Sequence, residues 1–460
     1  MPHPLLASSS ETALPIWFVT EETWPQAGGA LPQQAQAFAK AQGFTGKAGT
    51  HCLVPDGNGN LAGVLFGLDG AKTKRPDPFL PGKLVTLLPD GVYRFASAPP
   101  SPALATLAWL LGGYSFNRYR ARPAKSVRLV PPEGVDAQEL ARIAEAVAAS
   151  RDLISTPTSD LGPDGIEAAA RKIAEKHGAS FKSIVGDDLL KQNFPMIHAV
   201  GRASAIAPRL IDFTWGKAGH PLVTLVGKGV AFDTGGLDIK PAASMLMMKK
   251  DMGGAAATLA LADMIMGAGL AVRLRVLIPA VENSISANAF RPGDILKSRK
   301  GTTVEIGNTD AEGRLILADA LALADEEQPD VIVDFATLTG AARVALGPEL
   351  PAFFTEDDAF AGEIGKAAEN ANDPVWRMPL WSSYLAQLDS KIADLNNTGG
   401  PMGGSITAAL FLRHFVSAAK AYVHFDIFAW NNAAKPGRPE GAEVQAARAM
   451  YQLFKDRYGS

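Results

Sequence analysis

The feature that most constrains the fold of this chain is a regular alternation between short apolar runs and helix-type patterns from about residue 151 onward. The apolar runs have the length of strands and few polar residues, which is typical of strands covered on both faces. The segments are PLVTLVG at 221–227, an Ala-rich helix pattern at 253–272, VRLRVLIPAV at 272–281, a helix pattern at 315–327, DVIVDFATL at 330–338 and AYVHFDIFAW at 421–430. This order predicts an α/β protein whose larger part has a mixed, mostly parallel central sheet flanked by helices.

The sequence predicts three successive parts. Residues 1–130 mix short strand-like runs with helix-like patterns, which indicates a small N-terminal α/β domain. Residues 131–152 begin with paired prolines and continue as an amphipathic pattern, with Asp136 placed to cap a helix and Glu139 three residues further on. This part is typical of a linker helix. Residues 153–460 then form the larger α/β domain.

Composition and charge exclude several classes of protein. Of the 460 residues, 47% are hydrophobic and 20% are charged, as in an ordinary globular protein rather than a disordered or fibrous one. The formal net charge of −3 argues against a dedicated nucleic-acid-binding protein, which normally carries a basic excess. Cys52 is the only cysteine, so we expect no intrachain disulfide, no thiolate metal cluster and a reducing compartment, by default the cytoplasm.

The apolar stretch at 253–272 has the length of a membrane-spanning helix. However, Asp263 lies in its middle, most of its residues are small, and a strand-like run follows directly. We therefore expect a buried helix that leads into a buried strand, and no membrane segment. The first residues also lack the basic and apolar regions of a secretory signal.

Polar side chains gather just after the apolar runs. Ligands of open α/β sheets bind at the carboxyl ends of the strands, so these positions are candidates for a site. The stretch EIGNTDAEGRLILADALALADEE at 305–327 even places two acids and an arginine on alternate positions where a helix pattern begins. The candidate residues are Lys228, Asp233, Lys240, Asp251, Asp310, Glu312 and Arg314.

Each candidate has an ordinary explanation when it is taken alone. Acidic residues favour the first turn of a helix or stabilise turns, and loop lysines are usually solvated. Arg314 does not fit this explanation, because a cation is unfavourable at a helix N-terminus unless an anion is bound there.

Taken together, four carboxylates at one sheet edge would repel each other or stay unpaired unless cations held them, which favours a divalent metal. None of the seven histidines lies in an HExxH pattern, so the ligands would be oxygens, with one amine as an option.

The chain resembles the M17 leucyl aminopeptidases, cytosolic exopeptidases that use two metal ions. The motif NTDAEGRL at 308–315 is the signature of that family. Further matching segments follow in the family's order and spacing: GKGVAFDTGG at 227–236, KP at 240–241, KKDMGGAA at 249–256, SANAFRPGD at 286–294, and DFATLTGAARVALG at 334–347. The resemblance covers most of residues 220–350, with weaker similarity from RDLISTP at 151 to the C-terminus.

The resemblance implies that residues 153–460 are a catalytic di-metal peptidase domain. One metal ion would be held by Lys228, Asp233, Asp251 and Glu312, and the second by Asp233, Asp310 and Glu312. Asp233 and Glu312 would therefore bridge the two ions. Lys228 can ligate only as the neutral amine. Zinc or manganese is expected, with magnesium or cobalt as alternatives.

The resemblance also implies a mechanism. Two metal ions lower the pKa of a shared water and supply hydroxide at neutral pH. The free α-amine of a peptide would lie by the metal near Lys228 and lean on Asp251, which explains exopeptidase action. Lys240 would stay charged and stabilise the developing negative charge on the scissile carbonyl. Arg314, with backbone N–H groups near Gly313, would hold a bicarbonate that shuttles protons.

The substrate pocket and the assembly are further expectations from the resemblance. Met248 and the loop that carries Thr337, Leu338 and Gly340 would form an apolar cleft suited to Leu or Met, although Met248 has core packing as an equal alternative. The expected partners are peptides with a free N-terminus, and the expected assembly is a homohexamer.

The chain also departs from the family pattern. Ser155 and Ser159 stand where asparagines are usual, and the tail beyond HFDIFAW at 424–430 differs from that of many members. Two other classes of function stay open at this point. One is phosphoryl chemistry, which also uses carboxylate-bridged metal pairs. The other is a non-enzymatic protein, either a degenerate relative, which the intact set of candidate ligands opposes, or a nucleic-acid regulator. A lysine among the ligands counts against phosphoryl chemistry, and the net acidity counts against the regulator.

Overall fold

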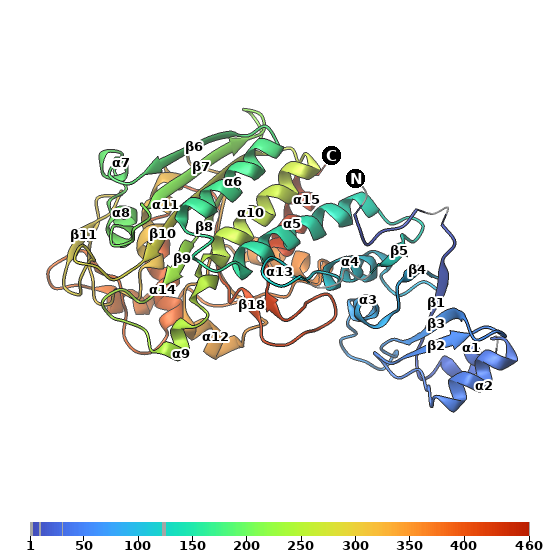
Figure 1. Cartoon of the computed structure of the whole chain (residues 1–460). Helices are drawn as coiled ribbons and strands as arrows, with labels where there is room; N and C mark the ends of the chain where they lie inside the picture. The colour runs from blue at the N-terminus through green and yellow to red at the C-terminus, as the bar shows by residue number, and fades with distance from the viewer. Residues whose placement is uncertain (1–2, 9–10, 30, 122–125, 460) are drawn as a thin grey trace. The chain divides into compact units, whose positions relative to one another are not determined.

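A computed structural model describes residues 3–8, 11–29, 31–121 and 126–459 of the chain (Figure 1). The chain divides into two compact units. Unit 1 comprises Met1–Ala148 and Ala433–Glu440, and unit 2 comprises Ala149–Asn432 and Gly441–Ser460. The division falls within helix α5 (Ala137–Ser155), whose first turn is capped by Asp136, because the Asp136 carboxylate accepts hydrogen bonds from the N–H groups of Gln138 and Glu139.

Unit 1 is built on a five-stranded sheet with the order β2-β3-β1-β4-β5. Strand β1 runs parallel to β3 and β4, and β2 pairs with β3 in the antiparallel direction. The strands are β1 (Leu14–Val19), β2 (His51–Pro55), β3 (Leu61–Gly67), β4 (Gly91–Phe95) and β5 (Val127–Val130). The helices are α1 (Trp24–Gly29), α2 (Gln33–Ala41), η1 (Leu80–Lys83), α3 (Leu84–Leu87) and α4 (Pro102–Gly112). This is the small N-terminal α/β domain that the sequence predicts.

Unit 2 is built on a larger mixed sheet with the order β15-β14-β17-β13-β8-β10-β7-β6, and β9 pairs with β10. Strands β17, β13, β8 and β10 are mutually parallel. Strands β7 and β6 are antiparallel to their neighbours, and β14 is antiparallel to β17 but parallel to β15. The strands are β6 (Ser180–Val185), β7 (Arg209–Trp215), β8 (Leu222–Gly227), β9 (Gly229–Asp233), β10 (Arg273–Asn283), β13 (Val331–Ala336), β14 (Ala352–Phe354), β15 (Trp376–Arg377) and β17 (Tyr422–Asp426). The predicted fold class, with a parallel centre in a mixed sheet, is confirmed.

Helices cover both faces of this sheet (Figure 1). On one face α6, α10, α13 and α15 pack together, and on the other α8, α11 and α14 enclose a large buried apolar cluster. The helices are α6 (Pro163–Lys176), α7 (Asp188–Lys191), α8 (Pro195–Gly201), α9 (Ala242–Met245), η2 (Met248–Met252), α10 (Gly253–Ala268), α11 (Gly313–Asp325), α12 (Gly340–Leu346), α13 (Asp358–Asn370), η3 (Ser382–Leu388), α14 (Gly404–Arg413) and α15 (Ala447–Tyr458).

Short strands complete unit 2. Strand β11 (Ile295–Lys297) pairs with β12 (Thr303–Glu305), which pairs with β16 (Leu395–Asn396). Strands β18 (Trp430–Asn431) and β19 (Gly441–Ala442) form an antiparallel pair in which Asn431 lies opposite Gly441. The segment Ala433–Glu440, which belongs to unit 1, therefore leaves and re-enters unit 2 at the two strands of one ladder.

The apolar stretch at 253–272 forms the buried helix α10 and leads into β10, as the sequence predicts. The α10 backbone approaches the sheet closely, because a Cβ on Gly254 would lie 2.1 Å from the Phe335 carbonyl oxygen. Asp263 is 6% exposed, and its carboxylate lies 2.8 Å from Lys176 Nζ. Among the described residues, no helix is both long and apolar enough to cross a membrane.

Candidate metal centre

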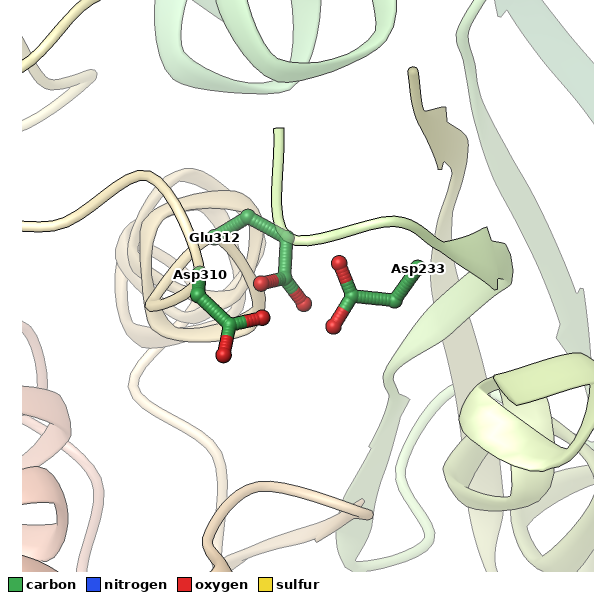
Figure 2. A group of neighbouring side chains, drawn as sticks. All are labelled: Asp233, Asp310 and Glu312. Atoms are coloured by element: carbon green, nitrogen blue, oxygen red, sulfur yellow. The ribbon is translucent and has the colours of Figure 1, made fainter. Parts of the chain in front are cut away.

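Three carboxylates face one another where α11 begins. Figure 2 shows Asp233, at the carboxyl end of β9, pointing toward Asp310 and Glu312, which precede α11. One oxygen from each of the three side chains lies within 4.8 Å of the others. Asp233 and Glu312 are buried and Asp310 is half-buried. These are oxygen ligands of the kind that divalent cations prefer.

Lys228 and Asp251 extend this group on the buried side. Lys228 lies between β8 and β9, and its Nζ is 2.8 Å from Asp251 Oδ2 and 3.0 Å from Glu312 Oε1. The same amine donates a hydrogen bond of 2.9 Å to the Thr337 carbonyl oxygen. Asp251 comes from η2, so segments distant in the sequence converge on one lysine.

Gly313 makes room for the Lys228 side chain. A Cβ at position 313 would lie 2.6 Å from Lys228 Cε and 2.7 Å from its Nζ, so a larger residue there would collide with the lysine. The glycine of the NTDAEGRL motif therefore has a steric reason that the sequence alone does not reveal.

Lys240 approaches the carboxylates from the more open side. Its Nζ lies 2.8 Å from Asp233 Oδ2 and donates a hydrogen bond to Asp310 Oδ1. Burial lowers the pKa of Lys240, but Asp233 and Asp310 offset this effect, so the pKa is raised above its usual value. The structure thus brings together both candidate lysines and all four candidate carboxylates.

Three carboxylate oxygens of this cluster, both of Glu312 and one of Asp251, lack hydrogen-bond donors among the described residues. Within the described part of the chain, neither oxygen of Glu312 accepts a hydrogen bond, although the residue is only 1% exposed. Asp251 Oδ2 is likewise without one, because its contact with Lys228 is close but lacks hydrogen-bond geometry. Burial, followed by repulsion from Asp233, raises the pKa of Glu312 to about 8 and that of Asp310 to about 6. Buried, unbonded and mutually repelling oxygens fit a site for bound cations.

Arg314 lies beside the cluster on the first turn of α11. It is 8% exposed, and its Nη1 donates a hydrogen bond of 2.7 Å to the Asn397 carbonyl oxygen. Its Nε has no partner among the described residues, and burial lowers the pKa of the guanidinium to about 10. A buried guanidinium with a free donor fits an anion site.

Two asparagines that the sequence did not single out organise the cluster. The Asn283 side chain donates hydrogen bonds to Asp233 Oδ1 at 2.8 Å and to the Thr309 carbonyl oxygen. The Asn397 side chain accepts from Gly307 and Asn308 N–H groups and donates to the Asn308 carbonyl oxygen. The sequence NNTGG around Asn397 indicates a loop, but neither asparagine carries a spacing signal that links it to the acids.

The candidate pocket residues have different surroundings. Thr337 follows β13, and its hydroxyl donates to Asp251 Oδ1 at 2.8 Å, which ties this loop to η2. Leu338 packs against the core cluster around α11. Met248 opens η2 and is half-buried, and Gly340 begins α12 with open space where a side chain would stand.

Comparison with known proteins gives the family of the chain. The sequence model of the cytosol aminopeptidase family, catalytic domain, matches residues 148–451. The model of the M17 aminopeptidase N-terminal domain matches residues 14–132. The chain belongs to the M17 cytosol aminopeptidase family. As such it is a metal-dependent aminopeptidase, a hydrolase of peptide bonds.

Relatives and solved structures agree with this assignment. A probable cytosol aminopeptidase of Geobacter sulfurreducens is 37% identical over 393 residues, which cover 82% of this chain and 79% of the relative. The solved cytosol aminopeptidase of Coxiella burnetii is 44% identical, with a TM-score of 0.93, and the match covers 98% of this chain and 99% of that one. The bottromycin maturation enzyme BotP in complex with Mn is 31% identical, with a TM-score of 0.88 over 97% of this aminopeptidase and 100% of BotP.

The family assignment decides among the classes of function that the sequence leaves open. The chain is a peptidase rather than a phosphoryl-transfer enzyme or a non-enzymatic regulator, because the two M17 family models together match most of its length. The predicted resemblance to the M17 family is confirmed.

Proposed function

We propose that this aminopeptidase removes the N-terminal residue from peptides by a two-metal mechanism, with a preference for apolar, Leu-like residues. The observation that supports this most strongly is Glu312, whose two carboxylate oxygens are buried without a hydrogen bond and share their space with Asp233 and Asp310. Cations are the partners that such oxygens need.

The residues that would hold the two ions are Lys228, Asp233, Asp251 and Glu312 for one, and Asp233, Asp310 and Glu312 for the other. When bound, the ions supply Lewis acidity and lower the pKa of water. Lys228 serves as a ligand only after losing its proton. Burial favours that loss, but Asp251 and Glu312 oppose it while their charges are not shared with a cation, so the pKa of Lys228 is raised in the structure.

The other side chains of the site would orient the peptide and its charges. Asp251 accepts the α-amine of the substrate, which restricts cleavage to free N-termini. Lys240 keeps its positive charge beside the scissile carbonyl and stabilises negative charge as it develops there. Arg314 and the N–H groups near Gly313 would hold a bicarbonate that relays protons, and the partnerless Nε of Arg314 supports this role. Met248 and the loop of Thr337, Leu338 and Gly340 would contact the N-terminal side chain.

Hydrolysis of a leucine chromogenic amide tests the proposed function directly. We expect cleavage of the free-amine substrate and none of its N-acetylated form, because the site must bind the α-amine. Chelation should abolish cleavage, and added manganese or zinc should restore it. Cleavage that survives exhaustive chelation, or that proceeds equally well on the N-acetylated form, would contradict the proposal.

Arg314→Ala is expected to lower kcat by about a hundredfold, the size of a typical acid–base contribution, while the metal content stays unchanged. Added bicarbonate should restore part of the activity. Metal content by plasma emission and kcat over a bicarbonate series measure both effects. Arg314→Lys serves as a control that keeps the charge but loses the planar fork of donors. Loss of both metal ions from Arg314→Ala would show that the arginine supports the metal ligands instead.

The native metal and the assembly belong to the same proposal. We infer zinc or manganese, and the manganese in the structure of BotP supports including manganese in every assay. We also propose a cytoplasmic homohexamer, for which light scattering should give six times the 48.4 kDa chain mass. A monomeric mass would overturn that assembly.

A further inference from the structure

Lys250 is a buried cation without a counter-ion. It lies in η2 between Met248 and Asp251, and it is 5% exposed. Among the residues that the structure describes, neither a hydrogen-bond acceptor nor a carboxylate lies within bonding distance of its Nζ. Burying an ammonium without such partners is unfavourable, so this position calls for an anion.

A second cation faces the same aromatic ring. Lys250 Nζ lies 4.5 Å from the centre of the Phe428 ring, and the guanidinium carbon of Arg343 lies 5.1 Å from that centre. Arg343 makes no ion pair with any described carboxylate. The ring attracts both cations through its π face, but it cannot neutralise either of them.

The two acids that act on Lys250 electrostatically, Asp251 and Asp426, are already bonded to other groups. Asp426 accepts hydrogen bonds from the Leu338 and Thr339 N–H groups at 3.1 Å and from the Thr339 hydroxyl at 2.6 Å. Asp251 accepts from the Thr337 hydroxyl and lies 2.8 Å from Lys228 Nζ. Neither carboxylate therefore forms an ion pair with Lys250.

Lys250 also belongs to the segment that borders the proposed pocket. Met248 stands two residues before it in η2, and the hydrogen bond from Thr337 to Asp251 joins η2 to the pocket loop. Arg343 lies on α12, which begins at Gly340 at the end of that loop. The two unpaired cations thus stand beside the place proposed for the N-terminal side chain.

We propose that this pocket also accepts an acidic N-terminal residue, Glu or Asp, with Lys250 as the specificity-determining residue that pairs with its carboxylate. This inference rests on the proposed aminopeptidase function. The methylene groups of Glu lie against Met248, and its carboxylate supplies the missing anion. Gln has the same shape without the charge, so it is the matched substrate for comparison.

The test uses the full-length, manganese-loaded protein with coumarin amides of Leu, Glu and Gln. We expect kcat/KM for Glu to exceed that for Gln by about tenfold or more, as one charge-assisted hydrogen bond allows. In Lys250→Met this ratio should fall to about one, because the cation is gone. Lys249→Met is the matched control, since Lys249 Nζ donates to the Ser155 carbonyl oxygen at 2.7 Å, and it should keep the wild-type ratio.

The outcomes separate the inference from the function on which it rests. Cleavage of Leu with equal kcat/KM for Glu and Gln in the wild-type protein would overturn the inference and leave the aminopeptidase standing. An unchanged ratio in Lys250→Met would also overturn it. Cleavage of none of the three amides in metal-loaded protein would overturn both. The wild-type ratio decides the question even if the Lys250→Met variant does not fold.

Discussion

Glu312→Gln is expected to release metal and to lower kcat/KM by more than about a hundredfold, beyond the 10- to 100-fold that outer-shell partners of a metal contribute. The substitution keeps the shape of the side chain and removes one charge. Glu312 is proposed as a ligand of both ions, so a weaker ligand at this position would affect the whole centre. Metal per chain after gel filtration, together with leucine amide hydrolysis, measures the effect.

A second readout separates this charge effect from simple damage to the fold. In chelated protein, Glu312 is a buried carboxylate without a hydrogen bond and near Asp233. Lys228 Nζ lies 3.0 Å from Glu312 Oε1, but burial and the neighbouring acids outweigh this attraction, and the pKa of Glu312 is raised. The neutral amide removes that net cost, so chelated Glu312→Gln should unfold at a higher temperature than chelated wild type. Glu326→Gln is the control, because this acid is exposed and pairs with Arg299 outside the centre. Glu312→Gln protein with full metal content and full activity would remove Glu312 from the ligand set.

Lys240→Met is expected to lower kcat by about 100- to 1,000-fold, the range for loss of one donor that stabilises a developing oxyanion. The methionine fills similar space without a charge. KM should change much less than kcat, because the lysine acts on charge that develops during the reaction. Bound metal should be retained, since Lys240 is not assigned as a ligand.

Steady-state kinetics with a leucine amide and metal analysis on the same samples test this expectation. Lys240→Arg keeps a positive charge near Asp233 and Asp310 and should retain more activity than Lys240→Met. A rise in KM at constant kcat would instead make Lys240 a substrate-binding residue. Loss of metal from Lys240→Met would mean that the lysine positions the carboxylates to which it is bonded.

The sequence predicts the sheet and much of the cluster because both depend on local patterns. The apolar runs at 221–227 and 330–338 form β8 and β13. The acids Asp233, Asp310 and Glu312, which lie at the ends of such elements, are close together in the structure. Asn283 and Asn397 were not predictable in this way. Each acts through hydrogen bonds to residues far away in the sequence, and a single asparagine has no periodicity.

Steric and electrostatic relations were equally hidden from the sequence. The need for a glycine at position 313 depends on the path of the Lys228 side chain, which comes from another part of the chain. Lys250 lacks an ion pair because the carboxylates of Asp426 and Asp251 accept hydrogen bonds from other groups. The motif KKDMGG shows two lysines in a row, and only the fold distinguishes the one bonded to the Ser155 carbonyl oxygen from the one left unpaired.

The segment Ala433–Glu440 affects how unit 2 could be produced without unit 1. Its ends are held together by the pairing of β18 with β19, where Asn431 lies opposite Gly441. The segment Ala433–Glu440 is thus the tip of a hairpin whose two strands, β18 and β19, both belong to unit 2 and are paired with each other. A short turn could replace the tip at a small cost in loop-closure entropy. We therefore expect that Ala433–Glu440 can be replaced by a short turn while unit 2 stays one continuous chain.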